Sequence, residues 1–204
     1  MGKSKYEQFR DHLNTLDDAD RDVALHSTKG QIYLIVEAIS QQARRLRESN
    51  SVVHTSHQAD AILLVYALRT LLSLGELAVR LVPAREQDNV QAALDSFASC
   101  VSDAINARDA LAHIDEYLVG FGKQQQKAPA ERFLPWFSRW GTNYTVRVGP
   151  FAIPVDDAET SAVALATAVL LAERDSASQK DPDDPDELDA LVEYASRTAL
   201  DDPD

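Results

Sequence analysis

The chain has 204 residues, 45% of them hydrophobic, which is enough for one compact domain with a buried core. Its single cysteine, Cys100, excludes an intramolecular disulfide and a zinc site with paired cysteine ligands, and it favours a reducing cytoplasm. The formal net charge of −13 makes indiscriminate binding to nucleic acid unfavourable, because the average surface repels phosphate.

The N-terminal residues 1–8 pass into charged sequence without an apolar run, a pattern that does not fit a secretory signal. Further along the chain, we expect no apolar run long enough to cross a bilayer. The sequence therefore predicts a cytoplasmic protein without a membrane partner.

Two long helices are predicted in the first half of the chain. Apolar residues recur with a helical period over residues 20–48, with Gly30 as a possible break. Residues 49–57 lack this period and are rich in hydroxyl and amide side chains, which predicts a loop. A second helix follows over about residues 58–82, and Pro83 is expected to end it.

A third long helix is predicted over about residues 86–118, and Gly120 and Gly122 follow its expected end. Its apolar stripe consists of Val90, Leu94, Phe97, Val101, Ala104 and Ile105. A polar loop over residues 123–131 comes next.

The chain then becomes rich in aromatic and β-branched residues. Trp136 and Trp140 fall at helical spacing, which favours packing in a core over stacking on bases. Residues 144–155 have the pattern of a small β-hairpin around a Gly-Pro turn, and Pro154 marks its second arm as an edge strand.

A last helix, capped by Asp156 or Asp157, is predicted through about Arg174. Residues 175–186 are rich in Asp, Ser and Pro and cannot bury enough area to offset the entropy of ordering, so we expect them to be disordered. The expected fold is mainly α: an antiparallel helical bundle over residues 1–174, with a small β-hairpin insertion at about 144–155 and a disordered acidic C-terminal tail over 175–204.

One basic residue interrupts the apolar stripe of the third helix. Continuing that stripe by steps of three and four residues reaches Arg108, so an arginine is predicted at a core position, where it needs a partner or a ligand. His113 lies about 140° around the helix from Arg108. Asp109 lies one turn before His113 on the same side, where it is expected to orient or charge the imidazole.

Arg108, the polar Asp109 directly after it, and His113 five positions past the arginine resemble the signature of the HEPN superfamily (higher eukaryotes and prokaryotes nucleotide-binding). The resemblance covers mainly residues 58–118. It implies a metal-independent ribonuclease of a bacterial toxin or defence type, with RNA as its substrate and an antitoxin or other protein as a possible partner. It also implies a homodimer in which the motifs of two protomers meet in one cleft.

The residue types suit such a reaction. A histidine with a pKa near neutral can take the proton of a ribose 2′-hydroxyl as this oxygen attacks the adjacent phosphorus. An arginine can hold the phosphate oxygens as charge builds up on them. We therefore expect Arg108, Asp109 and His113 to form the site, and the helix that carries them to line a homodimer cleft with the Arg108 of the second protomer nearby.

Two observations leave an alternative open. Arg21 and His26 have the same spacing and are likewise separated by an Asp, but they precede the long helices and are taken as a chance match. Arg108 and Asp109 also suit an ordinary ion pair, with His113 as an exposed histidine at a helix end. The alternative function is then a non-catalytic helical protein-interaction module.

No cofactor is expected from the sequence. His54 and His57 have a spacing compatible with a metal pair, but no acidic or cysteine ligand stands at matching spacing. We therefore predict two loop histidines and no metal site.

Overall fold

The computed structural model describes residues 4–48, 54–114, 116, 136–140 and 143–172. Within these residues the chain is mainly helical, with one three-stranded antiparallel sheet. In chain order the elements are α1 (Lys5–Thr15), α2 (Asp18–Glu48), α3 (His54–Leu81), α4 (Ala84–Cys100), α5 (Ser102–Ala112), β1 (Trp136–Trp140), β2 (Asn143–Val148), β3 (Phe151–Pro154) and α7 (Val155–Leu171). The predicted acidic tail lies outside the described residues.

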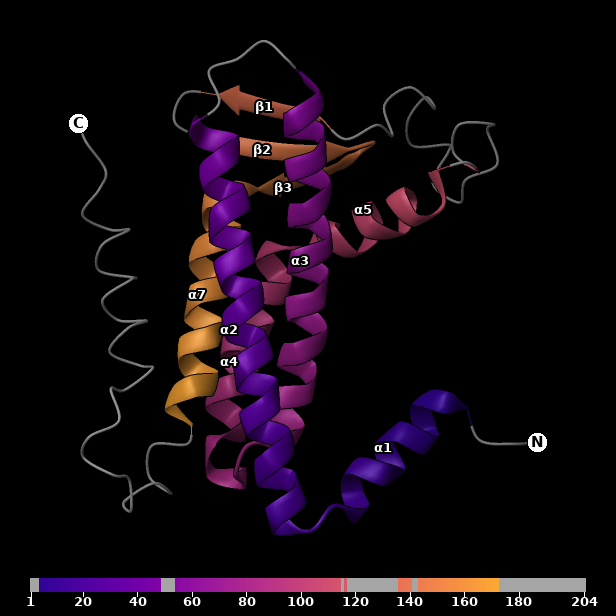
Figure 1. The fold of residues 1–204 in the computed structure, drawn as a ribbon, viewed down its shortest axis with the longest axis vertical. Coiled ribbons are helices and arrows are strands. Elements are labelled where there is room, and N and C mark those ends of the chain that lie inside the picture. The colour runs from indigo at the N-terminus through magenta and orange to yellow at the C-terminus, as the bar shows by residue number, and fades with distance from the viewer. Residues whose placement is uncertain (1–3, 49–53, 115, 117–135, 141–142, 173–204) are drawn as a thin grey trace.

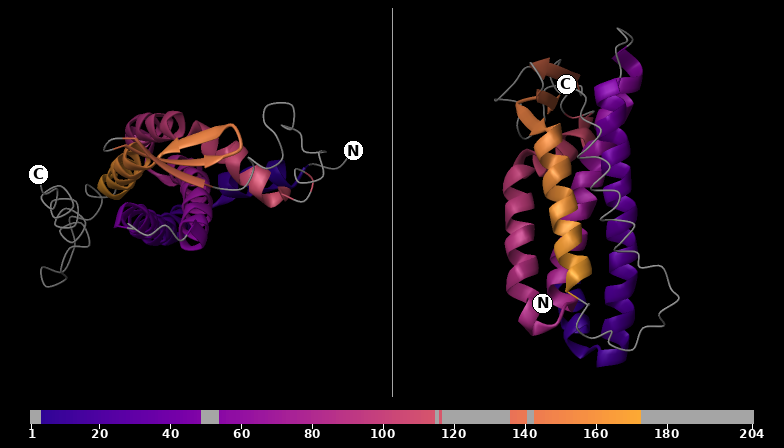
Figure 2. Two further views of the ribbon diagram at one scale, coloured as in Figure 1. Left: turned by 90° about the horizontal axis from the view of Figure 1, so that it is seen from above. Right: turned by 90° about the vertical axis from the view of Figure 1, so that its left-hand side faces the viewer.

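Four long helices form the bundle that the sequence predicts. α2 and α3 lie side by side on one side of it, and α4 and α7 lie behind them (Figures 1 and 2). The sheet lies across one end of the bundle, and α5 projects from the bundle beside α3 (Figure 1). α1 projects at the opposite end (Figure 1).

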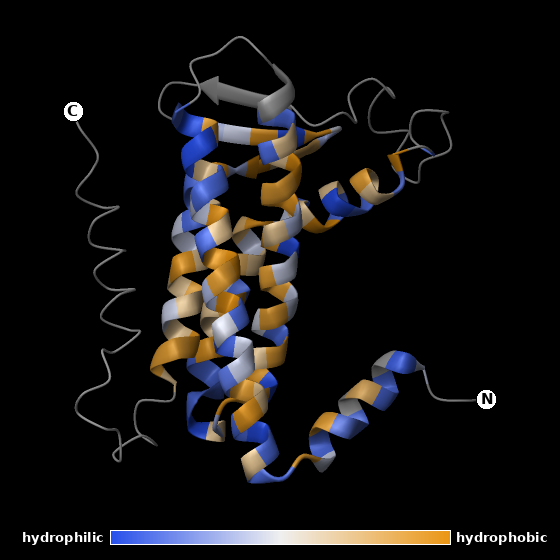
Figure 3. Cartoon of the chain, in the orientation of Figure 1, coloured by the Kyte–Doolittle hydropathy of each residue, from blue (hydrophilic) through white to orange (hydrophobic). Residues whose placement is uncertain are grey.

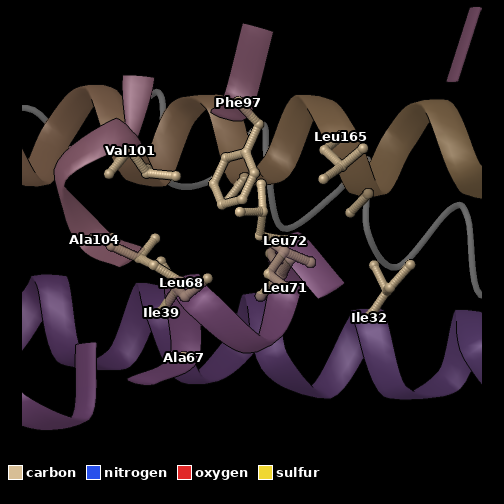
Figure 4. Close-up of a cluster of buried hydrophobic side chains, with 14 of the residues drawn as sticks. Ile32, Ile39, Ala67, Leu68, Leu71, Leu72, Phe97, Val101, Ala104 and Leu165 are labelled. Carbon is tan, nitrogen blue, oxygen red and sulfur yellow. The ribbon is translucent and has the colours of Figure 1, made fainter. Parts of the chain in front are cut away.

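One continuous apolar core joins these helices. Phe97 of α4 is fully buried, close to Leu72 of α3 and Leu165 of α7 (Figure 4). Ile32 and Ile39 belong to the buried stripe of α2. Each is three or four residues from the next buried residue of this stripe, as the apolar period predicts.

The expectation that no apolar run is long enough to cross a bilayer is wrong for α3. By length and composition alone, residues His57–Leu81 are long and apolar enough for a membrane span. Of their most apolar 18-residue stretch, 44% is buried inside the protein. α3 packs against α2, α4, α5 and α7, as a core helix of a bundle does. The apolar composition that gives α3 the length of a span is therefore also the composition that its packing in the bundle requires.

Several predicted boundaries shift in the structure. α2 continues through Gly30 without a break, and α3 already begins at His54, so both histidines of the predicted loop lie in its first turn. α7 begins at Val155 with Pro154 at its N-cap and without a side-chain cap, so the predicted capping by an aspartate is wrong. The acidic residues Asp156 and Asp157 lie instead in its first turn, where the helix dipole favours them.

Helix α1 was not predicted. It begins with a capping box, in which the Ser4 side chain accepts a hydrogen bond from the Glu7 backbone N–H and the Glu7 carboxylate accepts one from the Ser4 N–H. The spacing of Ser4 and Glu7 is the sequence signal that identifies this helix start.

The β-hairpin is confirmed, and a third strand joins it. β2 and β3 pair in antiparallel register around the turn at Gly149, which has φ of 60°. β1 pairs with the other side of β2, with Trp136 opposite Arg147 and Trp140 opposite Asn143. The helical spacing of the two tryptophans was therefore misleading, because their segment is a strand.

The outer edge of β3 is closed. The backbone N–H of Ala152 donates to Asp103 Oδ2 of α5 at 2.9 Å, and Pro154 has no N–H to offer. The same hydrogen bond fixes the first turn of α5 to the sheet.

Two cations of α2 hold α7 at its two ends. Lys29, which is buried, points Nζ at the carbonyl oxygen of Leu170 at 3.5 Å, near the C-terminus of α7. Arg47 bonds Asp156 at 2.8 Å and also pairs with Glu159, near the N-terminus of α7. Burial lowers the pKa of Arg47, but hydrogen bonds and charge attraction from Glu159 and Asp156 outweigh it and raise this pKa overall.

We expect Arg47→Ala to lower the free energy of unfolding by about 1–3 kcal/mol, because it leaves the carboxylate of Glu159, which is only 16% exposed, without its partner. The matched control is Arg44→Ala, whose pair with Glu48 is two-thirds exposed on both sides. That change should cost about 0.5 kcal/mol or less. Urea unfolding measures both, and equal losses would contradict the role of Arg47.

Two helical glycines should respond in opposite directions to alanine. Gly30 is exposed and has open space around it, so Gly30→Ala should stabilise the protein by about 0.5–1 kcal/mol. At Gly75, an added Cβ would lie 2.7 Å from Leu94 Cδ1 and 3.1 Å from Leu165 Cδ2. Overpacking should outweigh the gain in helix propensity there, so Gly75→Ala should lower the melting temperature. A rise in both melting temperatures would show that the core around Gly75 is looser than described.

Candidate functional site

The candidate residues lie on α5, a separate helix and not the continuation of α4. Val101 ends α4 with φ of −103° and ψ of 25°, and the Ala104 N–H donates to the Val101 carbonyl at 2.8 Å as α5 begins. Asp103 in the first turn of α5 favours this restart. The predicted single helix over residues 86–118 is therefore wrong, and α5 ends at Ala112.

The break changes which residues of α5 face the core. Ala104, Ala107 and Ala110 are buried, whereas the Arg108 side chain is 43% exposed. The prediction that Arg108 occupies a core position is therefore wrong. It followed from extending the stripe of α4 across Val101, where the helical phase is not continued.

Each candidate side chain bonds a neighbour on the surface. Arg108 NH1 lies 3.1 Å from Asp109 Oδ1, and His113 Nδ1 lies 3.4 Å from Glu116 Oε1. The Asp109 carboxylate thus engages Arg108, and the backbone carbonyl of Asp109 accepts a hydrogen bond from the His113 N–H at 3.2 Å. All four side chains are between 43% and 60% exposed, so these pairs hold the groups weakly and leave them accessible.

His113 is the C-cap residue of α5, with φ of −120° and ψ of 34°. It therefore stands where the helix dipole favours a cation. α5 projects from the bundle (Figure 1), and the side chains of Arg108 and His113, which it carries, are 43% and 60% exposed. Such a position suits a large substrate or a second protein.

A groove lies between α3, α4 and α5. It has a volume of about 340 Å³ and includes Ile105, one turn before Arg108, but neither Arg108 nor His113 lines it. Glu76, Arg80 and Asp95 also line it. No sequence pattern indicates this groove, because it depends on how three helices pack.

The second Arg-His pair has a structural use. Arg21 donates to the carbonyl oxygens of Arg80 at 3.3 Å and Leu13 at 3.4 Å, at the C-terminal ends of α3 and α1. The guanidinium of Arg21 therefore links α1, α2 and α3. The guanidinium of Arg108 bonds Asp109 of its own helix instead. His26 is exposed on α2.

No group of three or more His, Cys, Asp or Glu side chains that could hold a metal ion is found among the described residues. His54 and His57 lie in the first turn of α3, not in a loop.

A further surface feature was missed from the sequence. Large apolar side chains are exposed on the outward faces of α2 and α3, among them Leu34, Leu63 and Tyr66. The available signal was α3 itself, whose apolar residues exceed what one buried face needs.

Comparisons with family models, with curated proteins and with solved structures found no match to this chain.

Proposed function

We propose that the protein is a HEPN-like, metal-independent ribonuclease of a bacterial toxin or defence type, with its site at Arg108, Asp109 and His113. The observation that supports this function is the exposure of Arg108 and His113 on one projecting helix, where their side chains are 43% and 60% exposed. A folded or single-stranded RNA can reach both groups there.

The proposed reaction is a transesterification. The imidazole of His113 takes the proton of a ribose 2′-hydroxyl, the 2′-oxygen bonds the adjacent phosphorus, and the bond from phosphorus to the 5′-oxygen breaks. The imidazolium then returns a proton to the departing 5′-oxygen. Arg108 stabilises the charge that builds up on the phosphate oxygens, and the exposed Asp109 keeps the guanidinium near the helix surface.

One α5 alone places Arg108 and His113 about 140° apart around the helix axis. A homodimer eases this separation, because each protomer then adds groups to the site of the other. The protein is proposed to act in the cytoplasm as a homodimer, and an antitoxin or another protein is a suitable regulator of an exposed site.

The test is an RNA-cleavage assay in EDTA with His113→Ala protein as the baseline. We expect 5′ products that end in a 2′,3′-cyclic phosphate, which mass spectrometry identifies, because the nucleophile is the 2′-hydroxyl. Cleavage that stops when EDTA is added would overturn the proposed chemistry.

A second candidate function is supported by the surface of the bundle. The exposed apolar side chains of α2 and α3, and the pairing of Arg108 and His113 with neighbours on their own helical segment, fit a non-catalytic protein-interaction module. Purified protein that cleaves varied RNAs no faster than His113→Ala protein would favour this function.

A further inference from the structure

The groove between α3, α4 and α5 carries its polar side chains towards one end. α3 and α4 are antiparallel, because the chain reverses at residues 82 and 83 between them. The part of the groove nearer this turn is lined by four polar side chains, those of Arg80, Glu76, Gln91 and Asp95. The part nearer α5 is lined by the apolar side chains of Ala98 and Ile105. A ligand that fills the groove must therefore present both a polar edge and an apolar body.

The size of the groove suits a small ligand or one group of a larger one. Its volume of about 340 Å³ lies at the lower end of the range of about 300–1,000 Å³ that is usual for ligand sites. Leu72 and Leu94, both largely buried, form part of its wall. Apolar walls with a few polar groups are the usual composition of such sites.

The polar groups of the groove favour a neutral ligand with hydrogen-bond donors. Gln91 Nε2 donates to Asp95 Oδ1 at 2.7 Å, which orients the carboxylate and leaves it lone pairs for further donors. Glu76 adds a second carboxylate from α3, and Arg80, four residues further on the same face, adds N–H donors. The arginine repels a simple cation and the two carboxylates repel an anion, so a neutral group suits the groove better than either.

Ile105 connects this groove to the candidate site. It is 37% exposed and lines the groove from the first part of α5. Arg108 and His113 follow three and eight residues later, which places them about 60° and 80° to either side of Ile105 around the helix. Arg108 is about 4.5 Å further along the helix axis. Figure 3 shows hydrophilic as well as hydrophobic residues on α5, where it projects from the bundle.

We propose that the groove binds a guanine base of the RNA, the one next to the phosphate that Arg108 holds. A base is a flat, neutral group with its donors and acceptors at its edges, and unstacked bases are read on these edges. Among the four RNA bases, guanine alone has two adjacent donors on its Watson–Crick edge, N1–H and the N2 amine, beside the acceptor O6. The carboxylates of Asp95 and Glu76 accept the two donors, and Arg80 donates to O6.

This inference rests on the proposed function for its RNA substrate and deepens it by naming the base beside the broken bond. It also explains how an acidic chain can bind RNA at this place. Only the neutral base enters the groove with its two carboxylates, whereas the phosphate stays outside, at Arg108. Arg80, Asp95 and Glu76 are thus specificity-determining residues, while Arg108 and His113 act on the reacting atoms.

The binding test does not depend on cleavage, because its probes are single nucleotides. The original chain is titrated with the 5′-monophosphates of guanosine, inosine, adenosine, cytidine and uridine, and binding is followed by NMR. Guanosine monophosphate should bind at least about tenfold more tightly than each of the others, since a hydrogen bond to a charged group is worth this much in affinity. Inosine monophosphate is the sharpest comparison, because it lacks only the N2 amine.

Asp95→Asn and Glu76→Gln keep the shape of each side chain but remove its charge and one acceptor oxygen. Each should weaken binding of guanosine monophosphate at least about tenfold. The matched control is Asp88→Asn, which changes an exposed aspartate of α4 outside the groove and should leave the affinity unchanged. Glu76 and Asp95 are exposed, so all three variants should fold, and circular dichroism checks this. In RNA cleavage, Asp95→Asn should remove the preference for guanine beside the broken bond, whereas His113→Ala should lower cleavage at every site.

Equal binding of the five nucleotides, or an unchanged affinity of the Asp95→Asn protein for guanosine monophosphate, would overturn the inference. Binding of spermidine, a simple cation, in preference to guanosine monophosphate would overturn it as well. RNA cleavage with no preference for guanine would count against the groove and leave the proposed function standing. Selective binding of guanosine monophosphate by a protein that cleaves no RNA would support the groove and count against the proposed function alone.

Discussion

His113→Ala should lower the rate of RNA cleavage in EDTA by about 100- to 1000-fold, and Arg108→Ala should have a similar effect. Loss of one charge-assisted contact to the transition state commonly costs about 2.7–4 kcal/mol, which corresponds to this change in rate. Because both side chains are about half exposed and outside the core, neither substitution should lower the melting temperature by more than a few degrees. The measurement is the initial rate on a labelled RNA together with a thermal unfolding curve.

The control for this experiment is already present in the chain. His26→Ala changes an exposed histidine in the second Arg-His pair and should leave the cleavage rate unchanged. Arg21 is a poor control, since it holds carbonyl groups of α1 and α3 and its loss should destabilise the fold. Equal rates for His26→Ala and His113→Ala proteins would remove the basis for assigning α5 as the site.

Phe97→Ala should lower the free energy of unfolding by about 3–5 kcal/mol, the largest loss of stability expected from a single substitution in this protein. Phe97 is fully buried between α4, α3 and α7, and the neighbours seen in Figure 4 belong to three helices that cannot all move in to fill the space. A loss of this size amounts to a large part of the stability of a typical domain.

Phe9→Ala provides the matched comparison. Phe9 lies on the projecting helix α1 and is 47% exposed, so its truncation should cost less than about 1 kcal/mol. Denaturant unfolding of the two variants measures both effects. Similar losses would mean that α1 packs more closely on the bundle than the structure shows.

The helices of the bundle could be predicted because each has a buried stripe with the helical period. α2 is the clearest case, since its buried residues recur from Leu25 to Leu46 and the helix continues through its single glycine, Gly30. The hairpin could be predicted from the Gly149-Pro150 turn between two β-branched segments. These signals are local, and a sequence displays them directly.

The position of Arg108 could not be predicted in the same way. A helix that restarts at Ser102 changes the direction in which every later residue points, and Val101 is an apolar residue that fits the stripe whether or not the helix continues. Strand β1 was missed for a related reason, since the spacing of Trp136 and Trp140 fits both a helix and one face of a strand. In both cases the long-range packing decides between two local structures.

The helical period identifies the core face of α3. It places Ala61, Leu64 and Leu68 on the apolar face, and all three are buried. Leu63 and Tyr66 lie off that face and are exposed. The period alone does not show that these two large apolar side chains stay uncovered, because that depends on where the neighbouring helices pack.

The closed edge of β3 has a consequence for the behaviour of the protein at high concentration. An unpaired strand edge can template the addition of strands from other molecules, the growth step of amyloid-like polymers. Here the Ala152 N–H is occupied by Asp103 and Pro154 has none, so an incoming strand finds no free donor at either position. Polymerisation from this side of the sheet first requires α5 to detach, which couples resistance to aggregation to the same helix that displays Arg108 and His113.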